Sequence, residues 1–360
     1  MRGHAQLLAI RAPSCTACAI DRGGVIDVDV DGASLLNAAM RIAFVLVLAA
    51  CSSPSNPSSV DGQPVTPPGV DAADPTTMPD ALAASDAPAA PSTCVGRTAQ
   101  PVDATWTLTV GGKVRTSLVH VPASYDPTKA MPVVIDLHGL GGDGAQEAAL
   151  TSANANADSA GFISVHPTGA TTPIGSWNAG QCCGTAPSEH VDDMGFLTAL
   201  LDELDAKLCV DDARVYAMGI SNGGYMSHRL ACELADRFAA IGPVAGGIAV
   251  SSCQPSRPVP VFAVHGNADQ LVSYSFGQSS ASFWAMHNGC TTTTTTFHNG
   301  TATCVTHGGC TAGADVVWCT IDQGGHQWPG GQTIPFLGNN TNDLIATDAI
   351  WAFFVAHPRP

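Results

Sequence analysis

Basic side chains are scarce in this sequence. Only 14 Lys and Arg stand against 30 Asp and Glu, which gives a formal net charge of -16 over 360 residues. Such a chain repels phosphate backbones, so we expect no nucleic-acid partner. Charged residues of both signs make up only 12% of the chain. This composition is compatible with a neutral polymer or a small uncharged ester as ligand, and it selects neither.

Long apolar runs are also missing. The apolar run at residues 42–50 falls short of the roughly 20 residues that a membrane-spanning helix needs. A short basic start precedes this run and small residues followed by Cys51 end it, so residues 40–51 resemble a bacterial lipoprotein signal peptide that ends in a lipobox cysteine. We expect Met40 to be the initiator, Cys51 to be lipidated and residues 1–39 to be a mis-called extension. The alternative is a buried strand or helix near the N-terminus.

Proline, serine, alanine and aspartate dominate residues 52–92. A segment of this composition cannot bury enough apolar area to offset the entropy lost on ordering, so it is typical of a disordered tether. We expect it to hold a catalytic domain, residues 93–358, away from a membrane. The expected location is extracytoplasmic: lipid-anchored to the outer membrane or cell surface, or secreted.

Paired C-x-x-C motifs with zinc spacing are absent, and the single C-x-x-C is Cys15–Cys18. We therefore expect no metal site. The ten cysteines that follow Cys51 are Cys94, Cys182, Cys183, Cys209, Cys232, Cys253, Cys290, Cys304, Cys310 and Cys319. An even set in an exported chain predicts disulfides, with scattered buried thiols as the alternative. Cys182 and Cys183 are neighbours, so each is expected to bond a distant partner.

The last four cysteines are expected to pair among themselves. Four cysteines allow three connectivities, and the sequence alone does not choose between them. We favour Cys290 with Cys310 and Cys304 with Cys319, because the second pair would tie a strand-like stretch to the expected strand 316–321. Such a link would restrict the loop that follows this strand.

From residue 93 onward, apolar β patterns alternate with helical patterns. Several runs are continuously apolar, as strands buried on both faces require. The alternation predicts a mostly parallel, doubly wound sheet flanked by helices. The expected strands are 106–110 and 114–121, joined as a hairpin by Gly111-Gly112, then 133–137, 162–166, 214–218, 239–244, 259–264 and 316–321. The expected helices are 145–159, 191–208, 223–235, 275–288 and 343–356.

A G-x-S-x-G motif follows the expected strand 214–218. It reads Gly219-Ile220-Ser221-Asn222-Gly223 and leads into a helical pattern. This context is typical of a nucleophile elbow, in which the serine occupies a strained turn and glycines on both sides relieve clashes. Ser221 is therefore our candidate nucleophile. The alternative is a serine that caps the helix.

A serine nucleophile needs a histidine base and an acid that orients it, in the order serine, acid, histidine for this arrangement. Asp269 comes shortly after the expected strand 259–264, and His326 lies in the loop after the last expected strand. We take these two residues as the candidate acid and base. His298 and His307 precede the last strand, in a threonine-rich loop, and are not chosen.

The tetrahedral intermediate requires two backbone N–H donors. One is expected from Asn222, directly after the nucleophile, and the other from Leu140 in the loop after strand 133–137. His138 begins that loop and is expected to brace the turn rather than act as a base.

These segments together resemble a group of secreted esterases that includes polyhydroxybutyrate depolymerase-like lipoproteins, feruloyl esterases and acetylxylan esterases. The matching segments are Leu137–Asp143, Ser176–Gly180, Cys182–Gly184, Val191–Asp193, Gly219–Gly224, His265–Asp269 and Gly325–Gly330. The resemblance covers the whole expected domain. It implies an α/β-hydrolase fold without a large separate lid domain, and a catalytic triad of Ser221, Asp269 and His326.

The resemblance implies a serine carboxylic ester hydrolase that works through an acyl-enzyme without a metal or organic cofactor. Cell-wall esters of the feruloyl or acetylxylan type are the favoured substrates, polymeric or small, and the enzyme is expected to be a monomer. A poly(3-hydroxybutyrate) depolymerase is the alternative within this class. A non-catalytic, polymer-binding surface lipoprotein is the alternative from another class.

Three further features have expected roles. Trp177 and Trp328 are candidates for substrate contact, since an amphipathic ring suits a partly wet cleft, although Trp177 suits core packing equally. Asp192 and Asp193 are expected to begin the helix that follows, where acidic side chains cap free N–H groups.

Overall fold

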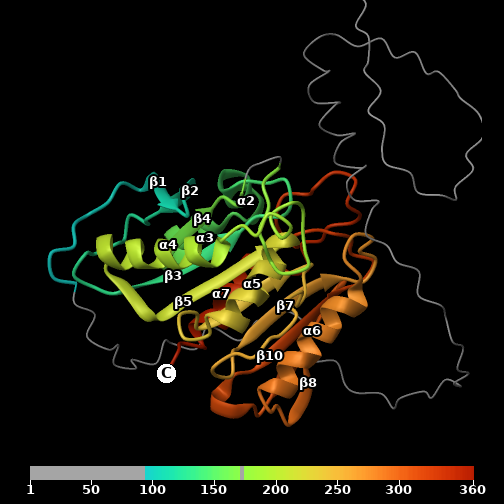
Figure 1. Ribbon diagram of the computed structural model, residues 1–360. Coiled ribbons are helices and arrows are strands. Elements are labelled where there is room, and N and C mark those ends of the chain that lie inside the picture. The colour runs from blue at the N-terminus through green and yellow to red at the C-terminus, as the bar shows by residue number, and fades with distance from the viewer. Residues whose placement is uncertain (1–93, 171–173) are drawn as a thin grey trace, which may run out of the picture. The chain divides into compact units, whose positions relative to one another are not determined.

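The computed structural model describes residues 94–170 and 174–360, and these residues form a ten-stranded sheet (Figure 1). The strand order across the sheet is β1-β2-β4-β3-β5-β6-β7-β10-β9-β8. The strands are β1 (Asp103–Val110), β2 (Lys113–His120), β3 (Met131–Leu137), β4 (Ile163–Pro167), β5 (Val210–Ile220), β6 (Ala240–Val244), β7 (Val261–Gly266), β8 (Thr292–Asn299), β9 (Ala302–Gly308) and β10 (Val316–Ile321). The expected signal peptide, its Cys51 and the tether lie outside the described residues.

The middle of the sheet is parallel. Strands β4, β3, β5, β6, β7 and β10 lie side by side in that order and run in the same direction. Antiparallel strands extend the sheet at both edges, with β2 and β1 beyond β4 and with β9 and β8 beyond β10. The prediction of a mostly parallel, doubly wound sheet is confirmed for its central strands.

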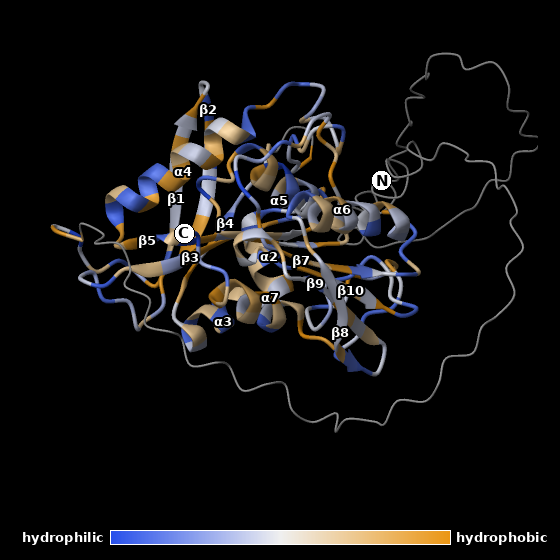
Figure 2. Cartoon of the chain, turned by 90° about the horizontal axis from the view of Figure 1, so that it is seen from below, coloured by the Kyte–Doolittle hydropathy of each residue, from blue (hydrophilic) through white to orange (hydrophobic). Residues whose placement is uncertain are grey.

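Helices cover both faces of the sheet. Figure 2 shows α4, α5 and α6 on one side of the apolar central strands and α2, α3 and α7 on the other. The helices are α2 (Gly144–Thr151), α3 (Ala153–Ala160), α4 (Asp193–Lys207), α5 (Asn222–Glu233), α6 (Tyr274–His287), α7 (Ala346–Val355) and the short 3-10 helix η1 (Thr311–Gly313). A two-faced sheet of this kind requires an apolar core on each side.

Alternate residues of the central strands supply these two cores. On β3, Val133 and Ile135 belong to the cluster that also contains Trp284 of α6, whereas Val134 belongs to the cluster that contains Phe354 of α7. Successive side chains of a strand point to opposite faces, so a strand with a core on each face must be apolar at nearly every position. This explains the continuous apolar runs in the sequence.

The expected helix 145–159 is interrupted. The structure has two helices there, α2 and α3, separated by Ser152, which adopts a left-handed conformation with φ 56°. A non-glycine residue at positive φ cannot continue an α-helix, so the chain changes direction at this residue.

The threonine-rich segment is a β-hairpin, and its interpretation as a loop was wrong. Thr292–Asn299 forms edge strand β8, which pairs with β9, and β9 pairs with β10. Nearly all side chains of β8 are exposed. The strand therefore lacks apolar alternation, and only the β-branched threonines indicate it.

Five disulfides occur within the described residues. They are Cys94–Cys209, Cys182–Cys183, Cys232–Cys253, Cys290–Cys310 and Cys304–Cys319. The favoured pairing of the last four cysteines is confirmed. The expectation of distant partners for Cys182 and Cys183 is wrong, because the other eight cysteines bond one another and leave these neighbours as each other's partner.

The helices of the described ranges are too short or too polar to cross a membrane. The longest apolar faces of these helices contact the sheet instead.

Candidate active site

Ser221 occupies a sharp turn between strand β5 and helix α5. Its backbone has φ 54° and ψ -122°, a conformation that residues other than glycine rarely adopt. Its N–H donates to the carbonyl of Val244 on β6 (2.9 Å), which fixes the turn to the neighbouring strand. The Ser221 side chain makes no capping hydrogen bond to helix α5. The alternative of a helix-capping serine is therefore wrong, and the turn has the geometry of a nucleophile elbow.

The glycines around Ser221 allow β3 to approach the turn. A Cβ atom added to Gly219 or to Gly223 would collide with the backbone carbonyl of Leu137, the last residue of β3. Neither position therefore tolerates a side chain. The motif has glycine at these two positions because β3 packs closely against both the end of β5 and the start of α5.

His326 and Asp269 are in direct contact. The Nδ1–H of His326 donates to Oδ2 of Asp269 over 2.7 Å, and both side chains are almost fully buried. Asp269 follows β7 and His326 follows β10, and these two strands are parallel neighbours. The carboxyl ends of these two strands lie at the same end of the sheet as the carboxyl end of β5, which Ser221 follows. The fold therefore brings the three predicted residues to one end of the sheet.

Three hydrogen bonds reach the Asp269 carboxyl group, and the His265 ring, which bonds Val272 O (3.0 Å), lies close to it. Besides His326, the backbone N–H groups of Leu271 (2.8 Å) and Val272 (3.0 Å) donate to Oδ1, and Nε2 of His265 lies 3.3 Å from Oδ2. Burial alone would raise the pKa of Asp269, but the contacts with the His265 and His326 rings hold it well below its ordinary value. Asp269 is therefore a carboxylate at neutral pH and can orient the His326 ring.

The loop that carries His326 is fixed by backbone contacts. The N–H of His326 donates to Leu337 O (2.7 Å), and the side chain of Gln327 bonds to Ile334 through both its oxygen and its nitrogen (2.8 Å each). A Cβ atom at Gly325 would collide with the same Leu337 carbonyl. The histidine is thus held on a closely packed loop rather than on a free one.

The two expected oxyanion donors lie on segments beside Ser221. Asn222 is the first residue of α5, so its N–H has no partner inside that helix. Leu140 follows Gly139, and a Cβ atom added to Gly139 would lie 3.5 Å from Cβ of Ser221. The loop after β3 therefore passes directly beside the nucleophile, as two converging N–H donors require.

His138 braces the loop of Leu140, as predicted. Its Nδ1–H donates to Gly139 O (2.7 Å), and its Nε2 accepts from the N–H of Gly169 (2.9 Å). Burial lowers the pKa of His138 to about 4. The ring is neutral at physiological pH, with both nitrogens occupied, so it is unsuited to proton transfer.

Trp177 and Trp328 do not line an open surface. Both side chains are fully buried, and their indole N–H groups donate to His138 O and to Thr347 Oγ1, respectively (3.0 Å each). The expectation of substrate contact for these two residues is corrected to a packing role, because a fully buried ring has no face left for a ligand.

An aromatic pair that sequence reasoning missed lies next to Asp269. Tyr225 of α5 stacks on Phe276 of α6 with 5.8 Å between ring centroids, and Phe276 is 38% exposed. Burial, and then the negative charge of Asp269, raise the pKa of Tyr225 to about 12. Tyr225 comes one helical turn after Ser221, which is the sequence signal that could have identified it.

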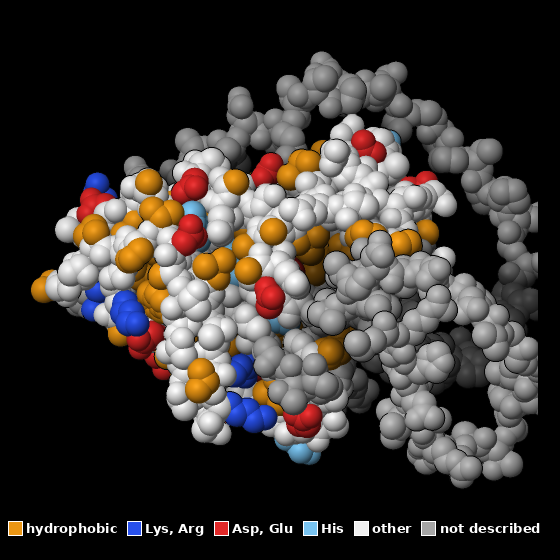
Figure 3. All heavy atoms as spheres, turned by 90° about the horizontal axis from the view of Figure 1, so that it is seen from above, with side chains coloured by type: hydrophobic (Ala, Val, Ile, Leu, Met, Phe, Trp, Pro, Cys, Tyr) orange, Lys and Arg blue, Asp and Glu red, His pale blue; other side chains and the backbone are white. Residues whose placement is uncertain are grey.

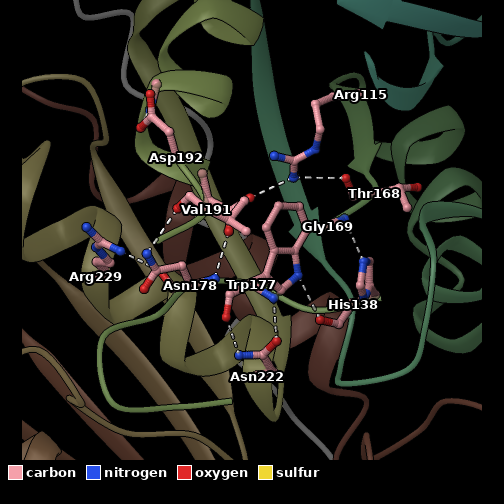
Figure 4. Close-up of polar contacts among 12 residues, drawn as sticks. Arg115, His138, Thr168, Gly169, Trp177, Asn178, Val191, Asp192, Asn222 and Arg229 are labelled. Atoms are coloured by element: carbon pink, nitrogen blue, oxygen red, sulfur yellow. Dashed lines mark hydrogen bonds and ion pairs between the residues drawn. The ribbon is translucent and has the colours of Figure 1, made fainter. Parts of the chain in front are cut away.

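A buried ion pair was also missed. Asp192 caps α4 as expected, but Asp193 is fully buried and bonds Arg115 of β2 (2.6 Å) and the N–H of Asn178 (2.7 Å). Figure 4 shows Arg115 beside the ring of Trp177. Arg115 lies on the same inward face of β2 as Val119. Its even spacing from Val119 along the strand was the sequence signal that could have identified it as buried.

Charged groups are few and of mixed sign on the face drawn in Figure 3, where apolar side chains form several patches among uncharged polar ones. Within the described ranges, no group of three or more His, Cys, Asp or Glu is arranged to hold a metal ion.

Three comparisons relate this chain to known proteins. It is 33% identical over 233 residues to feruloyl esterase B of Piromyces equi, which covers 59% of this chain but only 42% of that protein. It is 28% identical over 251 residues to feruloyl esterase C of Emericella nidulans, covering 67% of this chain and 84% of that one. The solved acetyl xylan esterase of Aspergillus awamori has a TM-score of 0.51 at 16% identity, covering 70% of this chain and 99% of that one.

The chain thus spans less than half the length of feruloyl esterase B. The likeness to the solved structure supports the fold alone. The sequence model of the phospholipase/carboxylesterase family matches residues 122–307, which include Ser221 and Asp269. Because this match covers more than half of the chain, and the fold agrees with it, the chain belongs to the phospholipase/carboxylesterase family of α/β-hydrolases.

Proposed function

We propose that this protein is a serine carboxylic ester hydrolase that acts through an acyl-enzyme. The observation that carries the proposal is the 2.7 Å hydrogen bond between His326 and Asp269, at the same edge of the sheet as the strained turn of Ser221. A base held by a buried carboxylate, next to a serine whose hydroxyl does not cap its helix, is the arrangement that nucleophilic catalysis requires.

In the proposed reaction, Oγ of Ser221 attacks the ester carbonyl while Nε2 of His326 takes the hydroxyl proton. The N–H groups of Asn222 and Leu140 stabilise the negative oxygen of the tetrahedral intermediate. His326 then gives the proton to the leaving alcohol, and an acyl group remains on Ser221. A water molecule, deprotonated by His326, releases the acid and restores the serine.

Asp269 supports both halves of this cycle. Its lowered pKa keeps it ionised at neutral pH. The carboxylate fixes the ring with Nδ1–H toward Asp269, which leaves Nε2 as the nitrogen available for Ser221. It also stabilises the imidazolium that forms after each proton transfer.

We infer that the substrates are plant cell-wall esters, of the feruloyl or acetylxylan type. The similarity to two feruloyl esterases supports this class, as does a chain with few charged residues. The partly exposed Phe276, stacked on Tyr225, offers an aromatic contact close to Asp269. We further propose that the protein is extracytoplasmic and lipid-anchored through Cys51, in agreement with the five disulfides of the described residues.

A turnover panel tests this function. Wild-type full-length protein is expected to hydrolyse p-nitrophenyl acetate and either methyl ferulate or acetylated xylan, and to react with a fluorophosphonate probe at Ser221. The Ser221→Ala variant should do neither. Faster turnover of poly(3-hydroxybutyrate) granules would assign the enzyme to polyester hydrolysis instead. Binding to xylan without turnover or probe labelling would contradict the proposed catalysis and indicate a binding protein.

A further inference from the structure

The side chain of Asn222 is held in place by two hydrogen bonds. It is fully buried and pairs with both polar groups of the Trp177 backbone: Oδ1 accepts from the Trp177 N–H (2.7 Å), and Nδ2 donates to the Trp177 carbonyl (3.1 Å). Figure 4 shows the two residues facing each other across these bonds. The residue proposed to supply one oxyanion N–H is therefore also bonded, through its side chain, to a segment 45 positions away.

Trp177 in turn contacts the segment of the second donor. Its indole N–H donates to the carbonyl of His138 (3.0 Å), two residues before Leu140, and its ring lies 5.1 Å from that of His138. The His138 ring then bonds Gly139 and Gly169. A continuous path of buried hydrogen bonds thus joins the start of α5 to the loop after β3.

The path is anchored at its far side. Asp193 accepts from the N–H of Asn178, next to Trp177, and its other oxygen accepts from Arg115. The Arg115 guanidinium lies over the ring of Phe196, 4.1 Å from its centroid, and bonds the carbonyl of Thr168 (3.2 Å). A fully buried ion pair that loses one partner leaves an unpaired charge, so this anchor resists displacement.

We propose that Asn222 and Trp177 form a clamp that sets the spacing of the two oxyanion N–H donors, and that the Asn222 side chain is a positioning residue for ester hydrolysis. This inference rests on the proposed function. The donors must lie within about 2.7 to 3.1 Å of the developing oxyanion, and they belong to two separate segments. The clamp is a buried side-chain connection that relates one segment to the other, in addition to the packing of Gly219 and Gly223 against Leu137.

The Asn222→Ala variant tests the clamp, because it removes the side-chain bonds and keeps the backbone N–H. If Asn222 acts only through its backbone N–H, the variant should keep the wild-type kcat. The clamp predicts that kcat for p-nitrophenyl acetate falls by about 10- to 100-fold with KM nearly unchanged, since a misplaced donor weakens the transition state more than the bound substrate. Inhibition by phenylboronic acid, whose serine adduct places an oxygen in the same site, should weaken by a similar factor.

Asn288 provides the matched control. It is also fully buried and also pairs with backbone groups, accepting from Val259 N–H (3.2 Å) and donating to Val259 O (2.7 Å) and Ala314 O (2.8 Å). These contacts lie where β7 and β10 begin, at the opposite end of these strands from Asp269 and His326. Asn288→Ala should lower Tm and leave kcat per folded molecule unchanged. An equal loss of kcat in both variants would overturn the clamp.

Trp177→Phe gives a second test if Asn222→Ala does not fold. It keeps the backbone bonds to Asn222 and removes only the indole donation to His138. Its control is Trp284→Phe, in which a fully buried indole loses its donation to His228 Nδ1 (3.0 Å). The clamp predicts a fall in kcat for Trp177→Phe alone, and wild-type kcat in that variant would overturn it.

The two proposals fail in different ways. A wild-type protein with neither turnover nor fluorophosphonate labelling would overturn the ester hydrolase and the clamp together. An active, labelled wild type whose folded Asn222→Ala variant keeps its kcat would overturn the clamp alone. Where both single variants fold, the double variant with Trp177→Phe should lose less than the product of the two single losses, because the changes interrupt one path.

Discussion

The carboxyl group of Glu147, on α2, interacts electrostatically with Asp136 of β3, the strand whose last residue packs against the nucleophile turn. Glu147 is almost fully buried, and so is Asp136 of β3, whose Oδ2 accepts from Thr151 (2.7 Å). Burial, and then the negative charge of Asp136, raise the pKa of Glu147 well above its ordinary value. Folding therefore favours the protonated form of the Glu147 carboxyl group relative to the unfolded chain.

We predict that Glu147→Gln stabilises the protein at neutral and alkaline pH. Glu147 binds its proton more tightly in the folded than in the unfolded state. Its contribution to the free energy of unfolding is thus fully present below the unfolded pKa, near 4.3, and is lost as pH rises toward the folded pKa. Glutamine keeps the shape and cannot ionise, so Tm of the variant should decline less between pH 5 and pH 9.

Glu189→Gln is the control for this measurement, since Glu189 is exposed. It removes the same formal charge and should reproduce the pH dependence of the wild type. Thermal scans of the three proteins at several pH values decide the matter. Parallel curves for wild type and Glu147→Gln would show that Glu147 does not hold a proton in the folded state.

We predict that Ser221→Ala and His326→Ala each reduce kcat by about 10³-fold or more with the fold intact, as in other triads. His307→Ala serves as the control, because His307 lies on β9 and its ring bonds the side chain of Thr293 in the edge hairpin (3.1 Å). Circular dichroism and Tm establish folding, and p-nitrophenyl acetate reports activity. A greater loss in His307→Ala than in His326→Ala would mean that the base has been misassigned.

The sequence predicted the parts of this molecule that leave a local pattern. The apolar runs of β3 and β10, the glycines around Ser221 and the chain order of serine, acid and histidine each follow from close packing or chemistry at neighbouring positions. A sheet with parallel central strands then places their carboxyl ends at one edge. The contact between Asp269 and His326 follows from that topology, although 57 residues separate them.

Features that depend on distant partners could not be read in this way. The segment around Trp177 has no sequence pattern that indicates burial, and its partners come from β2, the loop after β3 and α5. The ion pair of Arg115 with Asp193 joins residues 78 positions apart. Strand β8 pairs with β9 at the sheet edge without an apolar face, so its hydrophobic pattern is that of a polar loop and only its β-branched threonines indicate a strand. Tertiary contacts decide each of these cases.

We predict that Cys51 carries a lipid in the exported protein. A membrane fraction from bacteria that express the gene should contain the protein, labelled by an alkyne fatty acid. Cys51→Ser should abolish the labelling and release the protein from the membrane, because a single residue supplies the attachment sulfur. Cys94→Ser is the control, since Cys94 is bonded to Cys209 in the folded domain and should leave labelling unchanged. Equal labelling of the wild type and Cys51→Ser would contradict the lipobox assignment.

We predict that the disulfide between Cys304 and Cys319 stabilises the part of the sheet from which the His326 loop emerges. The two residues face each other across β9 and β10, and the bond closes a loop of 15 residues. A closed loop of this length contributes about 3 kcal/mol in the chain-entropy description, so the double alanine variant should unfold at a clearly lower temperature.

Non-reducing peptide mapping should recover Cys304 joined to Cys319 and Cys290 joined to Cys310. The bond lies on the strand that leads into the loop of the base. On heating, the double variant should therefore lose kcat at a lower temperature than the wild type, in parallel with its lower Tm. Unchanged Tm in the double variant, or peptides that join Cys304 to Cys209, would refute this prediction.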